Sequence, residues 1–196
     1  MPQNDTLPRR RLTGEFPPNP RAPYVELGVT SPFSFLRGAS EATDLVRTAH
    51  AQGHDALGIA DLNTMAGVVR LHAEALKAGI RPVIGCRLRL ITGEEFLAYP
   101  QDRAAWGRLC ALLSRGKMHD GQGNWQAKGA CDISLADLAT HATGTHLIVL
   151  PDDALPGRLA HLVRHLPTLR HIAVSHLYRG DDRARKIGRA SCRERV

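Results

Sequence analysis

The chain has 196 residues, of which 43% are hydrophobic and 23% are charged. This length supports one domain with a hydrophobic core and excludes two large ones. No apolar run reaches the ~20 residues that cross a bilayer, and the N-terminus lacks the apolar stretch of a signal peptide, so we expect a soluble, cytoplasmic protein without a membrane partner.

The formal net charge of +7 is concentrated at the two ends of the chain. Residues 1–23 carry +2 and the last ten residues carry another +2, which leaves +3 for the middle. So small an excess is a weak argument for phosphate binding. The four cysteines form no Cys-x-x-Cys pair, so we expect mostly buried free thiols rather than a zinc site or a disulfide framework. They are Cys86, Cys110, Cys131 and Cys192.

Apolar patterning and turn signals predict alternating strands and helices after a disordered lead-in at residues 1–23. The predicted elements in the first half are a strand at 24–27, a helix from Glu41 to Gly53 capped by Ser40, a strand at 56–60, a helix from about Thr64 to Gly79, and strands at 86–91 and 95–99 joined by a Thr92-Gly93 hairpin. Those in the second half are a helix from Asp102 to Leu113, a glycine-rich loop at 116–130, a helix that starts with a capping box at Ser134–Asp137, a strand at 146–150, a helix at 157–166 and a strand at 171–175. Long crossovers imply parallel strands and therefore an open or barrel-like α/β fold.

The ending at residues 186–196 breaks from the pattern before it. Back-translated with ordinary codons, residues 187–196 resemble a common sequencing-library adapter read in one frame. We therefore expect a non-native tail, with a genuine basic tail as the alternative. On this interpretation the natural chain is truncated here and continues beyond residue 185.

Five segments carry a recognisable set of motifs in a compatible order. They are YVELGVTSPFSFLRGAS at 24–40, LGIADLNTMAGVVRLH at 57–72, AGIRPVIGCRLRL at 78–90, LAYPQDRAAWGRLCALLSRGK at 97–117 and SHLYRGDDRAR at 175–185. Together they resemble the N-terminal PHP (polymerase and histidinol phosphatase) domain of bacterial C-family DNA polymerases, those similar to the α-subunit of DNA polymerase III, and in particular its error-prone branch. The resemblance covers residues 24–185 and implies an incomplete domain, the N-terminal two-thirds of a distorted (βα)7 PHP barrel.

The resemblance also implies a metal site for which this chain lacks the ligands. Active PHP domains gather metal ions at the C-terminal ends of their strands with histidine and carboxylate ligands, and these ions activate water for phosphoester hydrolysis. Gly28 and Thr30 stand where the active form has His-x-His. Leu62 replaces the histidine after Asp61, and a carboxylate position falls on Arg87, whose charge would repel a metal ion. Asp61 is the only retained candidate, so we predict no metal, cofactor or catalytic residue in this chain.

Other polar residues have simpler interpretations. His161 and His165 have the spacing of a metal-binding pair on a helix, but no third ligand accompanies them, so we expect a solvated helix face. Ser31 and Ser34 lie in a loop that lacks the glycines of a nucleophile elbow. Arg37-Gly38 could approach a phosphate, although a glycine-assisted turn also explains the pair.

The resemblance implies a fragment of an error-prone DNA-directed DNA polymerase for damage-tolerant synthesis and DNA repair, in which this part is an inactive scaffold. The parent enzyme would use Mg²⁺ in two-metal phosphoryl transfer. It would meet DNA through polymerase domains further along the chain, and other damage-tolerance proteins are candidate partners. The alternative is a stand-alone PHP-type metal-dependent phosphoesterase, and a third hypothesis is an interaction module encoded without a polymerase.

Overall fold

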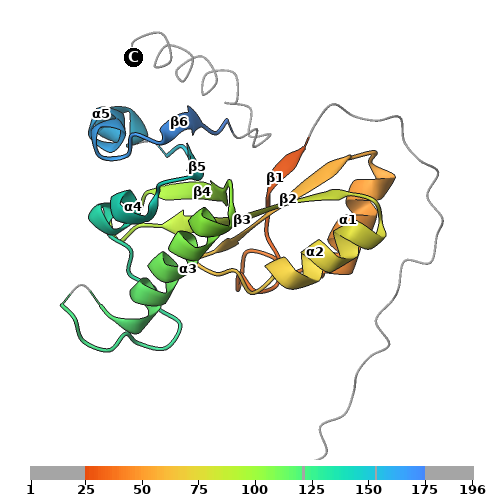
Figure 1. Cartoon of the computed structure of the whole chain (residues 1–196), viewed down its shortest axis with the longest axis horizontal. Helices are drawn as coiled ribbons and strands as arrows, with labels where there is room; N and C mark the ends of the chain where they lie inside the picture. The colour runs from red at the N-terminus through yellow and green to blue at the C-terminus, as the bar shows by residue number, and fades with distance from the viewer. Residues whose placement is uncertain (1–24, 121, 153, 175–196) are drawn as a thin grey trace, which may run out of the picture.

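The computed structural model describes residues 25–174 except 121 and 153. Its strands are β1 (Glu26–Val29), β2 (Ala56–Leu62), β3 (Arg81–Arg89), β4 (Glu95–Pro100), β5 (Thr145–Val149) and β6 (Leu169–Ile172). Its helices are α1 (Ala42–Ala51), α2 (Val68–Lys77), α3 (Arg103–Met118), α4 (Leu135–His141) and α5 (Leu155–His165). Figure 1 shows α1 and α2 grouped beside β1 and β2, and α3 and α4 grouped beside β3 and β4. The α/β class is confirmed.

The strands form one sheet in the order β1-β2-β3-β4-β5-β6. The pairs β1–β2, β2–β3 and β5–β6 are parallel, whereas β4 runs antiparallel to both β3 and β5. The predicted hairpin of β3 and β4 is therefore confirmed, and the expectation of parallel neighbours is wrong for β4 and β5. The physical reason is the tight turn at Gly93, with φ of 97°, which reverses the chain before the long excursion through α3 and α4.

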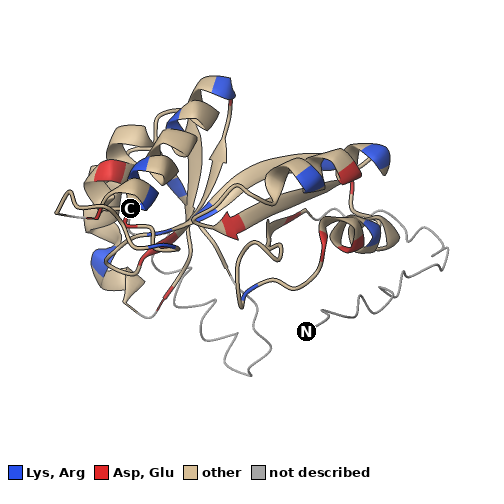
Figure 2. Ribbon diagram, turned by 90° about the horizontal axis from the view of Figure 1, so that it is seen from below, with Lys and Arg blue, Asp and Glu red and all other residues tan. Residues whose placement is uncertain are grey.

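Charged residues do not separate into one positive and one negative face. Figure 2 shows lysine and arginine, as well as aspartate and glutamate, scattered over the helices of both groups. An electrostatic function of this domain would therefore have to be local. Among the helices that the structure describes, none is long and apolar enough to span a bilayer.

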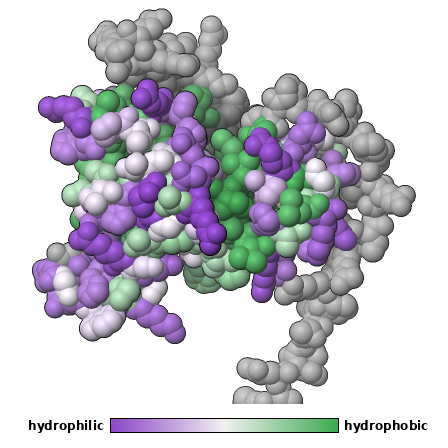
Figure 3. All heavy atoms as spheres, in the orientation of Figure 1, coloured by the Kyte–Doolittle hydropathy of each residue, from purple (hydrophilic) through white to green (hydrophobic). Residues whose placement is uncertain are grey.

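Three buried clusters pack against the sheet, and two of them hold helices to it. The first of these two lies beneath α1 and α2 and includes Val46, Leu57, Ile59, Leu71 and Ile80. The smallest cluster contains Ala60, Leu97 and Tyr99 from neighbouring strands, with Leu27, Val83 and Ile148 packed against it. Alternation along β2 places Ala60 and Ile59 on opposite faces, so this smaller cluster lines the face away from α1 and α2. Figure 3 shows apolar side chains gathered in a strip between the two helix groups.

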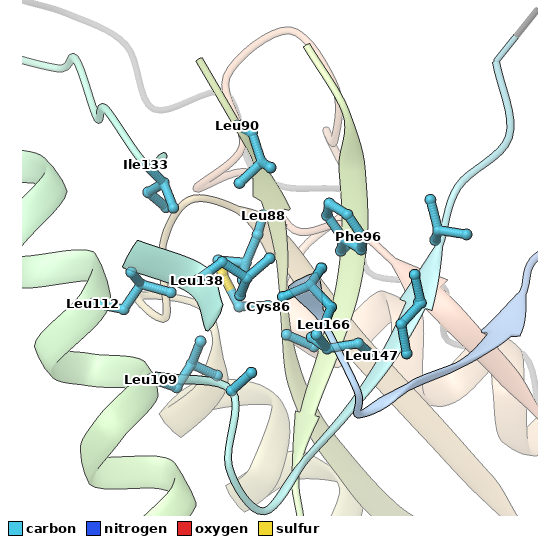
Figure 4. Packing of buried hydrophobic residues seen from close by; sticks show 14 of the residues in the cluster. Cys86, Leu88, Leu90, Phe96, Leu109, Leu112, Ile133, Leu138, Leu147 and Leu166 are labelled. Atoms are coloured by element: carbon cyan, nitrogen blue, oxygen red, sulfur yellow. The ribbon is translucent and has the colours of Figure 1, made fainter. Parts of the chain in front are cut away.

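The larger core joins the hairpin to α3, α4 and α5. Figure 4 shows leucines of α3 and α4 pointing toward β3 and β4, with Phe96 and Cys86 among them. Cys86 is fully buried, and burial raises the pKa of its thiol to about 12. Cys110 and Cys131 are partly buried, and all three thiols are free, as predicted. Cys192 lies outside the described residues.

Each predicted helix start can be compared with the hydrogen bonds found at that end. The Asp102 side chain accepts a hydrogen bond from the Ala105 amide, and the capping box of Ser134 and Asp137 is complete. The predicted Ser40 cap is wrong, because α1 begins one residue later and Glu41 occupies the cap position without a side-chain hydrogen bond. The other predicted bounds shift by a few residues. Helix α2 begins at Val68 rather than near Thr64, α3 continues to Met118, and β1 begins at Glu26.

Ile59 tests the packing of the first core cluster. It is completely buried, so the substitution Ile59→Val should lower the free energy of unfolding by about 0.5–1.5 kcal/mol. The same change at Ile91, which is 61% exposed, should have an effect within about 0.5 kcal/mol. Urea denaturation of both variants checks this, and equal losses would contradict the assigned core.

Candidate functional site

Asp61 lies near the C-terminal end of β2, where alternation along the strand places it on the same face as Leu57 and Ile59. Both of those residues belong to the core beneath α1 and α2. Asp61 is itself completely buried. A carboxylate in such surroundings is costly unless donors satisfy its oxygens.

The loop after β1 supplies those donors. The amide of Ser31 donates to Asp61 Oδ1 at 2.8 Å, and the Ser31 hydroxyl donates to Oδ2 at 2.6 Å. The hydroxyl of Ser34 donates to Oδ1 at 2.7 Å and accepts from the Leu62 amide at 2.8 Å. Both serines are buried. Asp61, Ser31 and Ser34, called here the Asp61 knot, therefore fasten the loop to the end of β2.

Two glycines allow the chain to close around the knot. A Cβ atom on Gly67 would lie 2.5 Å from Ser31 Oγ and still closer to Asp61 Oδ2. A Cβ atom on Gly38 would collide with the carbonyl oxygen of Ser31. This close approach requires glycine at the position directly before α2. Arg37-Gly38 does form a glycine-assisted turn, since the amides of both residues bond to the Ser34 carbonyl.

The other positions that the resemblance compares with metal ligands lie on or beside neighbouring strands. Leu62 of β2 pairs in register with Arg87 of β3. The Gly28 amide donates to Glu26 Oε1 at 2.7 Å, and the Thr30 hydroxyl donates to the Gly28 carbonyl at 3.3 Å. The structure thus brings Leu62 and Arg87 together and engages Thr30 with the backbone.

Arg87 binds a carboxylate from the hairpin. Its Nε donates to Glu95 Oε2 at 2.6 Å. Arg89 of the same strand and Arg37 of the loop also bind Glu95, at 2.5 Å and 3.1 Å. Burial alone would raise the pKa of Glu95, but the hydrogen bonds and charges of Arg89, Arg87 and Arg37 outweigh it and hold that pKa below its ordinary value. We call these four residues the Glu95 cluster.

Other candidate ligands do not gather. The rings of His161 and His165 lie 4.2 Å apart on α5, and one nitrogen of His165 contacts the His161 carbonyl at 2.9 Å. Within residues 25–174, apart from the two masked positions, no three histidine, cysteine, aspartate or glutamate side chains are grouped to hold a metal ion.

The sequence did not predict the partners within either polar group. Ser31 and Ser34 were assigned only to a loop, and Glu95 only to a strand. The signal for the Glu95 cluster was the alternation of Arg87, Arg89 and Glu95 about the predicted hairpin, which places all three on one face. No comparable signal linked the serines to Asp61.

A family model identifies the family to which this α/β domain belongs. Residues 26–189 match the model of the PHP domain. The chain therefore belongs to the PHP domain family.

The chain is also similar to much longer proteins named error-prone DNA polymerase. That of Brucella abortus is 40% identical over 178 residues, which span 85% of this chain and 16% of that protein. That of Bradyrhizobium sp. strain ORS 278 is 43% identical over 173 residues, which span 83% and 15%. The chain thus spans 16% or less of the length of these curated relatives.

Solved structures share the fold at low sequence identity. A Bifidobacterium adolescentis protein classed as a metal-dependent phosphoesterase superposes with a TM-score of 0.61 and 12% identity, covering 90% of this chain and 85% of that one. An amidohydrolase from Chromobacterium violaceum, solved with sulfate and no metal, gives a TM-score of 0.60 and 14% identity, covering 85% and 81%. This likeness is consistent with the predicted partial barrel.

Gly67 provides a test of the Asp61 knot. Gly67→Ala forces a methyl group against Asp61 and Ser31 and should destabilise the domain by about 1–3 kcal/mol. Gly107→Ala, in the middle of α3 with no atom near its Cβ position, should instead stabilise it by about 0.5–1 kcal/mol. Thermal unfolding of both variants measures the two effects, and a neutral Gly67→Ala would show that the knot is looser than described.

The Glu95 cluster predicts a dependence of stability on pH. Because the folded-state pKa of Glu95 is lowered, its contribution is complete above the ordinary value of 4.5 and is lost as pH falls through the folded-state value. The free energy of unfolding should therefore decrease on acidification below about pH 5. Glu95→Gln should flatten that slope, whereas Glu74→Gln, which removes an exposed pair with Lys77, should leave it unchanged. Identical slopes in the wild type and Glu95→Gln would refute the assignment.

Proposed function

We propose that this chain is a fragment of an error-prone DNA-directed DNA polymerase, in which the PHP domain is a metal-free scaffold. The names of the relatives support the polymerase, and the small share of their length that the chain spans leaves room for the catalytic domains. In that parent protein, Mg²⁺-dependent nucleotidyl transfer and DNA binding would belong to those domains. Damage-tolerant synthesis and repair follow from the same proposal.

The state of Asp61 is the observation that carries the scaffold role. A carboxylate offers about four lone-pair positions, and hydrogen bonds from Ser31 and Ser34 already occupy three of those of Asp61. Its burial leaves no approach for an ion. A carboxylate that binds a metal ion must direct an oxygen at the ion. Both oxygens of Asp61 instead accept hydrogen bonds from the loop after β1.

The charge beside the knot supports the same conclusion. Arg87 occupies the strand end next to Leu62, and Arg37 and Arg89 accompany it. Three guanidinium groups around a single carboxylate leave an excess of positive charge. Such a potential opposes a cluster of divalent cations, and the opposition grows as water is excluded.

A scaffold also needs a surface through which to brace the rest of the protein. The loop after β1 exposes Phe35 and Leu36, which are 85% and 90% accessible, and Phe33 is half-exposed beside them. On the adjoining helix α2, Val69 is also exposed. Contiguous apolar side chains on a surface are typical of contacts between domains or proteins. The Asp61 knot fixes the base of this loop.

A metal-dependent phosphoesterase is the second candidate function. The observation that favours it is the shared fold with the Bifidobacterium adolescentis protein of that description. At 12% identity that likeness concerns the fold alone. It does not indicate which residues of this chain would bind a metal ion. The two functions differ in whether metal is bound.

Metal analysis separates these candidates. After incubation with Zn²⁺ or Mn²⁺ and dialysis, the scaffold function predicts far less than one ion per chain and no hydrolysis of a phosphomonoester, because the strand ends carry Leu62 and Arg87. His161→Ala is the control, since it removes ions held only by the exposed histidine pair on α5. Stoichiometric metal that persists in His161→Ala would overturn the scaffold function.

The polymerase parent has a separate test in the genome. The reading frame beyond codon 185 should continue through a polymerase, and the codons for residues 186–196 should be absent from genomic DNA. Those residues lie outside the part that the structure describes. A stop codon soon after codon 185 would favour the interaction module.

A further inference from the structure

Two groups of ion pairs in this domain differ in their ratio of positive to negative side chains. Arg158 lies between two carboxylates, bonded to Glu94 at 2.7 Å and to Asp152 at 2.5 Å. The Glu95 cluster has the opposite composition, with three guanidinium groups around one carboxylate. Its formal charge is therefore positive by two. A concentration of like charge at one point is unfavourable unless another anion shares the site.

The three arginines of the Glu95 cluster also have hydrogen-bond donors that Glu95 does not engage. Glu95 is engaged through Nε and Nη2 of Arg89, Nε and Nη2 of Arg87, and Nη2 of Arg37. Within the described part of the chain, every hydrogen bond that the guanidinium groups of these three arginines donate ends on Glu95. Among those residues, none accepts a hydrogen bond from their Nη1 groups, which can therefore donate to a ligand.

The cluster is accessible and its arginines are already ordered. The side chains of Arg37 and Arg87 are each 29% exposed and that of Arg89 is 46% exposed, whereas Glu95 is 14% exposed. Glu95 thus lies beneath and the guanidinium groups reach solvent. Fixing three long side chains in advance lowers the entropy that a ligand must offset on binding.

We propose that Arg37, Arg87 and Arg89 form a phosphate-binding site supported by Glu95. Planar guanidinium groups match the oxygens of phosphate in bidentate geometry, and a phosphate carries the charge that the cluster lacks. The site binds phosphate and does not cleave it, because its one carboxylate, Glu95, is occupied by three guanidinium groups, and no group of metal-ligating side chains is found among the residues described. A free phosphate ion and a phosphate of a nucleic-acid backbone share this chemistry.

The inference rests on the proposed function in one respect, namely that metal ions do not occupy these strand ends. It does not depend on the identity of the parent protein. The Arg37-Gly38 turn now has a second role, since it carries the loop's only contribution to the cluster among the described residues.

Titration of the purified chain with inorganic phosphate, followed by calorimetry at low salt, tests the site. Arg37→Gln and Arg89→Gln should each weaken phosphate binding about tenfold, the value of one charged hydrogen bond. Arg37→Gln removes a single contact with Glu95 and leaves the hairpin pairs intact. Arg115→Gln is the matched control, because it deletes the same charge from a separate pair with Asp137, and it should leave the affinity unchanged.

A labelled single-stranded oligonucleotide in the same buffers distinguishes the two sources. Binding that weakens in Arg37→Gln and Arg89→Gln but not in Arg115→Gln assigns the site to a nucleic-acid backbone. Binding of free phosphate alone, with the same variant dependence, assigns it to the free ion. No phosphate binding, or equal affinity in all variants, overturns the proposal. Metal analysis of the same sample distinguishes a failure of the scaffold function from a failure of the phosphate site. Stoichiometric metal would overturn the scaffold function, whatever the phosphate result.

Discussion

Burial of the Asp61 carboxylate is the constraint on which this end of the domain depends. A charged oxygen pair beneath a helix must be satisfied or it destabilises the fold. Ser31 and Ser34 satisfy it, and in doing so they fix the loop that follows β1. The residue directly before α2 must be glycine for the same reason, because Gly67 packs directly against the carboxylate.

From that fixed loop, Arg37 extends to the hairpin and joins Arg87 and Arg89 at Glu95. The two polar groups therefore form a continuous connection from β1 through β2 and β3 to β4. Serine hydroxyls converge on Asp61 and guanidinium groups converge on Glu95. In the proposed scaffold function, these internal hydrogen bonds and ion pairs take the structural place of a metal cluster.

Local patterns in the sequence predicted the local features of the fold. Asp102 and Ser134 cap their helices because a side-chain oxygen and a nearby amide suffice, and Gly93 turns the hairpin. The antiparallel pairing of β4 with β5 was missed because the two strands are separated by α3 and α4, and periodicity says nothing about which distant strands become neighbours.

The same distinction applies to the candidate site. The motif resemblance placed Leu62 and Arg87 at strand ends, and they are indeed neighbours in register. It could not reveal that Asp61 would be bonded to serines about 30 residues earlier, because such a contact depends on the path of the loop. Nor could it show how Arg37 reaches Glu95 across 58 residues of sequence.

Anomalous diffraction from crystals grown with Mn²⁺ examines the central claim most directly, because it locates ions as well as counting them. We expect no anomalous peak at the ends of β1, β2 and β3, with Asp61 still bonded to Ser31 and Ser34. A peak coordinated by an Asp61 oxygen, with the serines displaced, would contradict the account.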